Sequence, residues 1–140
     1  MARRNKYGNI PTTVEGITFD SRLEARRYTA LRLLERCGEI SDLELQRRYE
    51  LIPAQYEVID TGEVYKRGPR KGAPKRRSRC VEAAAVYIAD FVYRDNHTGE
   101  VVVEDTKGRY TKDYVIKRKL MYCIYNIKIK EVREDNKYKK

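Results

Sequence analysis

Two apolar runs separated by a short polar segment are the feature of this chain that most restricts its fold. Residues 83–93 read AAAVYIADFVY and residues 100–108 read EVVVEDTKG. Both runs are rich in the β-branched and aromatic residues that strands favour. The intervening residues 94–99, RDNHTG, combine Asp, Asn and Gly as turns do. We therefore expect the two runs to pair as an antiparallel hairpin.

Charged residues occur near the end of each run. Asp90 lies in the first run, and Asp105 and Lys107 lie at the end of the second. Side chains alternate between the faces of a strand, so Asp105 and Lys107 share a face while Glu104 takes the other. The hairpin would carry Asp90 next to them. Adjacent carboxylates repel unless a cation neutralises them, and Mg²⁺ or Mn²⁺ prefers such oxygen ligands. With a lysine placed where a phosphate would sit, this cluster suits phosphodiester hydrolysis.

The cluster resembles the PD-(D/E)xK nuclease superfamily, in which an aspartate ends one strand and an acid-x-lysine follows on the next. Ala89 stands where that superfamily usually has proline, and Asp105 replaces the commoner glutamate. The similarity extends over nearly the whole chain, through YGNIPTTVEGITFDSRLEARRY, LELQRRYEL, YIADFVY, VEDTKG and YNIKIKEV. In this wider pattern the chain resembles a small nuclease family of phages and prophages.

The resemblance implies an α/β fold of the restriction-endonuclease-like type, with an αβββαβ core and a mixed central sheet flanked by helices. It implies a DNA endonuclease that uses Mg²⁺ or Mn²⁺, with branched DNA such as a Holliday junction among its candidate substrates. By resemblance, Asp90 and Asp105 ligate the metal and the backbone carbonyl of Thr106 is a third ligand. Lys107 would orient or help activate the attacking water.

Glu24 has two roles open to it. It is the fourth residue of Ser21-Arg22-Leu23-Glu24, which has the form of a capping box at a helix start. It also shares a helical face with Tyr28 and Leu31, so its carboxylate could look toward the sheet. Several members of the resembled superfamily use a glutamate of this first helix as an extra metal ligand or base, and we favour that role.

Two further polar residues are weaker candidates. Gln46 could reach the water at the metal site or the nucleic-acid backbone, although an exposed strand position explains it equally well. His97, the only histidine, lies in the turn between the two runs and is expected at the surface.

The formal net charge of +10 is concentrated in one segment. Residues 66–79, KRGPRKGAPKRRSR, hold eight of the 31 basic residues and no acid, which leaves 23 basic against 21 acidic residues elsewhere. Interleaved Gly, Pro and Ser favour a mobile loop inserted in a hairpin. We expect this basic loop to contact nucleic acid, the alternative being a solvated run that aids solubility. The nucleic-acid-binding candidates are Lys66, Arg67, Arg70, Lys71, Lys75, Arg76, Arg77 and Arg79.

Periodicity predicts the remaining elements. A helix is expected at about residues 21–37, a strand or bent pair of strands over 40–52, and a final strand over 127–132. Thr111 caps a second helix that ends at Asn126. Residues 1–18 lack a sustained period and are expected to form a loosely docked arm. The expected apolar stripe of the second helix consists of Ile116, Leu120, Cys123 and Ile124.

Length and composition limit the class of protein. A chain of 140 residues fits one nuclease domain, residues 1–140. Three widely spaced cysteines indicate neither a disulfide framework nor a zinc site. No membrane segment or signal peptide is recognisable, so we expect a cytoplasmic protein. A junction resolvase would have to be a homodimer, and a non-catalytic nucleic-acid-binding protein that retains the fold is the alternative function.

Overall fold

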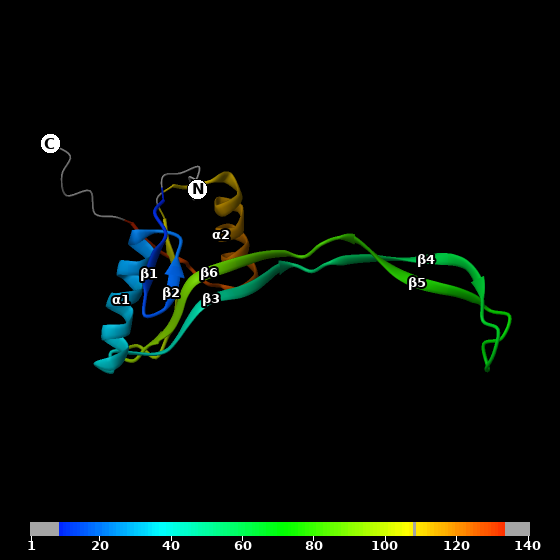
Figure 1. Cartoon of the computed structure of the whole chain (residues 1–140), viewed down its shortest axis with the longest axis horizontal. Helices are drawn as coiled ribbons and strands as arrows, with labels where there is room; N and C mark the ends of the chain where they lie inside the picture. The colour runs from blue at the N-terminus through cyan, green and yellow to red at the C-terminus, as the bar shows by residue number, and fades with distance from the viewer. Residues whose placement is uncertain (1–8, 108, 134–140) are drawn as a thin grey trace. The chain divides into compact units, whose positions relative to one another are not determined.

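The computed structural model describes residues 9–107 and 109–133, and Figure 1 shows the course of the chain. The chain divides into two compact units. One unit comprises the residues before Glu50 and after Val86, and the other is Glu50–Val86. The elements in chain order are β1 (Thr12–Val14), β2 (Ile17–Phe19), α1 (Arg22–Arg36), β3 (Ile40–Ile52), β4 (Gln55–Val64), β5 (Pro74–Glu82), β6 (Ala85–Asp95), β7 (Val101–Thr106), α2 (Lys112–Tyr125) and β8 (Lys130–Val132).

A mixed four-stranded sheet with the order β3-β6-β7-β8 organises the first unit. Strands β6 and β7 are antiparallel, with Phe91 opposite Glu104 and Tyr93 opposite Val102. Strand β8 runs parallel to β7, because α2 returns the chain to the same end of the sheet. The expected hairpin and the expected mixed α/β class with two helices are both confirmed.

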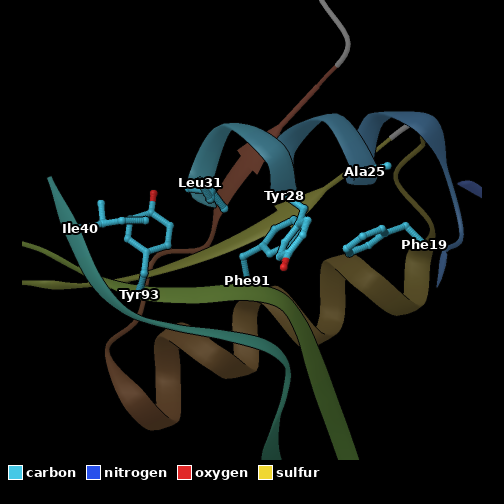
Figure 2. Packing of buried hydrophobic residues seen from close by; sticks show 7 residues of the cluster. All are labelled: Phe19, Ala25, Tyr28, Leu31, Ile40, Phe91 and Tyr93. Atoms are coloured by element: carbon cyan, nitrogen blue, oxygen red, sulfur yellow. The ribbon is translucent and has the colours of Figure 1, made fainter. Parts of the chain in front are cut away.

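Helix α1 covers one face of this sheet. Ser21 caps it, since its hydroxyl accepts a hydrogen bond from the Glu24 backbone N–H at 3.1 Å, as the capping-box pattern predicts. Leu31 and Phe91 are fully buried where the helix meets β6. Figure 2 shows these side chains between α1 and the sheet, with α2 beneath the opposite face. The cluster consists of Phe19, Ala25, Tyr28, Leu31, Ile40, Phe91 and Tyr93.

Two local predictions were wrong. Part of the expected arm forms a hairpin, in which β1 and β2 pair across Glu15 and Gly16, both with positive φ as a two-residue turn requires. Residues 1–8 lie outside the described residues. In α2, Tyr114 and Met121 are buried instead of the expected stripe, and Ile116 is 58% exposed. Apolar side chains occur on several sides of this helix, so its period did not identify the buried side.

The second unit confirms that the basic segment lies within a hairpin, but it corrects the extent of the predicted loop, since only residues 65–73 connect β4 to β5. Residues Pro74–Glu82 form strand β5, which pairs antiparallel with β4, so half of the basic residues lie on a strand. The acids of β4 explain this, because Glu57 forms an ion pair with Arg79 and Glu63 lies 3.7 Å from Lys75. Such cross-strand pairs of opposite charge stabilise a hairpin. Within the described parts of the chain, neither helix combines the length and the apolar composition needed to cross a membrane.

Candidate active site

Asp90 is fixed at the point where the β6–β7 ladder ends. The last aligned pair is Phe91 with Glu104, so the next residues on each strand are Asp90 and Asp105. Oδ2 of Asp90 accepts hydrogen bonds from the backbone N–H and from the hydroxyl of Thr106, each at 2.9 Å. The Thr106 carbonyl, which was predicted as a metal ligand, takes no part in these two hydrogen bonds. The half-buried Asp90 carboxylate is therefore held against the end of β7.

Asp105 and Lys107 lie on the same side of β7, as strand alternation predicts. Nζ of Lys107 is 3.0 Å from Oδ2 of Asp105. The hydroxyl of Tyr87 donates a hydrogen bond to the same oxygen at 2.9 Å. Nζ of Lys107 also lies 4.2 Å from the centre of the Tyr114 ring. This cation–π contact helps to orient the ammonium. Asp105 itself is only 3% exposed.

Glu24 and Gln46 complete the group from two other elements. Glu24, in the first turn of α1, is 7% exposed. Nε2 of Gln46 is 3.3 Å from Oε1 of Glu24 and 3.4 Å from Oδ1 of Asp90, so the amide bridges the two carboxylates. Gln46 lies within β3 yet has a φ of 53°, a left-handed conformation that is rare for a residue other than glycine. No local sequence pattern predicts this backbone irregularity.

Burial and neighbouring carboxylates raise the pKa values of Glu24 and Asp105. Burial, followed by the charges of Asp90, Asp20 and Asp105, raises the pKa of Glu24 to about 7. Burial and the neighbouring Asp90 raise the pKa of Asp105, and Lys107 offsets only part of this effect. Burial and the contact with Asp105 also raise the pKa of Tyr87, so the phenol stays a hydrogen-bond donor. The cluster thus carries more negative charge than Lys107 neutralises.

Glu104 serves a different purpose on the opposite face of β7. It is fully buried and accepts hydrogen bonds from Nε and Nη2 of Arg27 at 2.8 and 2.5 Å, and from the hydroxyl of Tyr93. Burial opposes its ionisation, but the bonds from Arg27 and Tyr93 outweigh burial and hold the pKa of Glu104 below its usual value. Glu104 therefore anchors α1 to the sheet and lies apart from the cluster around Asp105.

A pocket of about 630 Å³ opens above the acidic cluster. Glu24, Asp90, Asp105 and Lys107 all line it. Arg22, Arg26 and Arg109 line it as well, although none of the three was among the predicted site residues. Carboxylates surrounded by cationic side chains form a suitable environment for a phosphate group and a divalent ion.

The donor atoms suit a hard cation, because all of them are oxygens of carboxylates or of the backbone. Among residues 9–107 and 109–133, no three or more His, Cys, Asp or Glu side chains are already arranged as a metal site. A bound ion would need Glu24, Asp90 and Asp105 to move closer together, and its positive charge would offset the repulsion between these carboxylates. The predicted surface residue His97 is exposed and pairs with Glu39, away from these groups.

The eight basic candidates of residues 66–79 separate into two groups. Lys75, Arg76, Arg77 and Arg79 lie on β5, whereas Lys66, Arg67, Arg70 and Lys71 lie in the turn that joins β4 to β5. All of them belong to the second unit.

Comparisons with curated proteins and with solved structures gave no match. The model of one family, described as "Protein of unknown function (DUF1064)", matches residues 4–140. Since this match covers nearly the whole chain, the protein belongs to the DUF1064 family.

Proposed function

We propose that this protein is a metal-dependent endodeoxyribonuclease of the PD-(D/E)xK type. The observation that carries the proposal is the gathering of Asp90, Asp105 and Lys107 at adjoining strand ends, in a pocket that Glu24 also lines. The order of elements supports it, because α1, β3, β6, β7, α2 and β8, with the β4–β5 hairpin inserted after β3, have the order of the αβββαβ core of the restriction-endonuclease-like fold.

In this proposal Asp90 and Asp105 hold Mg²⁺ or Mn²⁺, with Glu24 and the Thr106 carbonyl as further ligands. Such an ion would polarise the scissile phosphate and lower the pKa of the attacking water. Lys107 offsets the charge that develops on the phosphate in the transition state. Glu24, with a pKa of about 7, is suited to accept a proton at its carboxylate if it is not a ligand. The Gln46 amide, which contacts both carboxylates, holds Glu24 and Asp90 in position relative to each other.

The test is a cleavage assay with the full-length protein on supercoiled plasmid DNA in Mg²⁺, Mn²⁺ or EDTA. We expect nicking that requires the metal and falls at least about 100-fold in Asp90→Asn and Lys107→Met, since each loses charge needed in the transition state. Both variants should keep their circular dichroism spectra and DNA affinity. Glu100→Gln, an exposed carboxylate next to β7, is the matched control and should cleave normally.

Two results would contradict the assignment. Full activity in Asp90→Asn or Lys107→Met would show that the cluster is not catalytic. Salt-sensitive DNA binding without cleavage in either metal would instead favour the alternative, a non-catalytic nucleic-acid-binding protein with this fold, which the basic hairpin would still serve.

The structure of the DNA substrate is tested separately. A resolvase must cut two strands of a junction, so it needs two active sites and hence a homodimer, whereas a nicking enzyme can act as a monomer. Light scattering distinguishes the 16.6 kDa monomer from a particle of twice that mass. Cleavage of four-way junction, duplex and single-stranded substrates then shows which DNA is preferred.

A further inference from the structure

The β4–β5 hairpin has no core of its own. Neither strand contains a buried side chain, and Tyr56 and Val58 are 65% and 68% exposed. A two-stranded ribbon without a packed face is only marginally stable by itself. Its charges therefore matter for both its stability and its function, and they are not distributed evenly along the hairpin.

The paired strands β4 and β5, which we call the shaft, carry cations that face acids. Arg79 forms an ion pair with Glu57, Lys75 lies 3.7 Å from Glu63, and Arg76 lies opposite Asp60. Arg77 is the exception, since it lies opposite Ile59. Three of the four shaft cations are thus next to or opposite a carboxylate that offsets their charge.

Residues 65–73, which we call the tip, have a different charge pattern. They contain Lys66, Arg67, Arg70 and Lys71 and no acid. Within the described chain, none of these four cations has a salt bridge. Backbone hydrogen bonds close the tip, because the Tyr65 N–H donates to the Ala73 carbonyl at 3.0 Å and the Gly72 N–H donates to the Tyr65 carbonyl at 2.9 Å. Gly68 and Gly72 both have a φ of 86°, which permits this tight path.

We propose that the tip is the phosphate-binding element of the hairpin and that the shaft cations mainly hold the two strands together. The inference rests on the proposed function, because it takes DNA as the polyanion. Four cations held close together without acidic partners would otherwise repel one another, and the closely spaced phosphates of a nucleic-acid backbone relieve this repulsion. Arginine in addition matches a phosphate with two parallel N–H donors.

Two combined variants of the full-length protein separate the tip from the shaft. The tip variant carries Lys66→Gln, Arg67→Gln, Arg70→Gln and Lys71→Gln. The shaft variant removes three cations together with their acidic partners, so its net charge is unchanged. Its substitutions are Glu57→Gln, Arg79→Gln, Asp60→Asn, Arg76→Gln, Glu63→Gln and Lys75→Gln.

Binding to a fluorescent duplex is measured by anisotropy from 50 to 300 mM KCl, with Ca²⁺ in place of Mg²⁺ to suppress cleavage. Each phosphate contact contributes about 0.9 to the slope of log affinity against log salt concentration. We expect the slope of the tip variant to fall by about 3 and its affinity at 100 mM KCl to drop at least about tenfold. The shaft variant should keep the slope and affinity of the wild type.

An unchanged salt slope in the tip variant would overturn the inference. An equal loss of slope and DNA affinity in the shaft variant would also overturn it, provided that circular dichroism shows both variants to be folded. Because unpairing the shaft could unfold the ribbon, the inverted pair Glu57→Arg with Arg79→Glu provides a second control, and it should bind DNA normally. Tip-dependent capture by phosphatidylserine vesicles that exceeds duplex binding at equal phosphate concentration would also overturn it. If the tip variant binds normally while Asp90→Asn still abolishes cleavage, the inference fails and the nuclease assignment stands.

Discussion

At the scale of single residues, burial and negative charge oppose each other at Glu24 and Asp105. Both carboxyl groups are almost inaccessible to solvent, and both have raised pKa values. A carboxyl that keeps its proton to a higher pH in the folded state makes the fold less stable as pH rises. The cluster therefore costs stability near neutral pH unless a cation compensates, as is common where a protein retains charges for function.

The first prediction concerns Glu24→Gln. The unfolded carboxyl loses its proton near pH 4.5 and the folded one near 7, so the folded state holds more protons between these values. Wild-type stability should fall across that interval in EDTA, and the variant should show a smaller decline, to which Asp105 still contributes. Above pH 7 the variant should be more stable by on the order of 3 kcal/mol. Urea unfolding at several pH values measures the difference.

Mn²⁺ provides the complementary measurement for Glu24. If the carboxylate helps to hold a cation, Mn²⁺ should raise the melting temperature of the wild type more than that of Glu24→Gln. Parallel stability curves against pH for the two proteins in EDTA would contradict the assigned raised pKa. Glu100→Gln, which removes an exposed carboxylate, serves as the control and should leave the pH dependence unchanged.

The second prediction concerns the backbone of Gln46. Its φ of 53° would suit glycine better, and a left-handed residue other than glycine costs about 1 kcal/mol. Gln46→Gly should therefore be more stable than Gln46→Ala by about that amount, as thermal unfolding would show. Both variants lose the amide that bridges Glu24 and Asp90, so both should cleave DNA more slowly. Equal stability of the two would indicate that this position is not strained.

At the scale of elements, the contact between α1 and β7 determines where Glu24 lies. Arg27 follows Glu24 by one helical turn and binds the buried Glu104 through two hydrogen bonds. Lys130 of β8 adds a cation 3.5 Å from the same carboxylate. This ionic anchor holds the first turns of α1 on the sheet, whereas the apolar cluster around Leu31 and Phe91 holds its later turns.

The third prediction therefore concerns Arg27→Met. The substitution leaves the Glu104 carboxylate buried without its main partner, which typically costs about 3 kcal/mol at neutral pH. Urea unfolding should show this loss, and the Mn²⁺ affinity should fall because Glu24 is less well held. The double variant Arg27→Met with Glu104→Gln should recover part of the stability, since no charge stays buried. Additive losses would contradict a direct interaction.

At the scale of the whole molecule, the two units differ in how they are stabilised. Apart from Leu51, the buried apolar residues belong to the first unit. The hairpin of the second unit depends on backbone pairing and on its cross-strand charges. Gln55 lies opposite Glu82 where the hairpin begins, so the chain ends that a deletion would join are neighbours.

The fourth prediction is that the first unit folds without the hairpin. Replacing Gln55–Glu82 by an Asn-Gly turn should change the melting temperature by only a few degrees, because the main cluster of buried residues is retained. Binding of Mn²⁺ should persist, whereas DNA affinity and its salt dependence should decrease. Loss of the cooperative melting transition would show that the hairpin contributes to the fold of the first unit.

Much of this fold could be read from local patterns. The Ser21 cap, the Thr111 cap and the Asn126 helix end depend on neighbouring residues only, and all three were predicted correctly. Strand alternation placed Asp105 with Lys107 and Glu104 on the other face. The buried face of α2 could not be predicted in this way. Apolar side chains occur on several sides of that helix, and the position of the sheet determines which of these sides is buried.

Strand β3 shows why periodicity alone was insufficient. Leu43 and Leu45 pack toward the cluster beneath α1, whereas Tyr49 contacts Tyr125 of α2 on the other face. All three positions have the same parity, so a regular strand would have kept them on one face. The left-handed backbone at Gln46 accounts for the switch and also turns its amide toward Asp90.

The sequence alone determined which charged residues share a face of their own strand, because side chains alternate along a strand as a consequence of its covalent geometry. Tertiary contacts alone bring Glu24 and Gln46 to Asp90, place Tyr87 beside Asp105, and set acids of β4 beside three of the four cations of β5. Those contacts join residues distant in the chain, and their free energy depends on burial and on facing charges that no local pattern specifies.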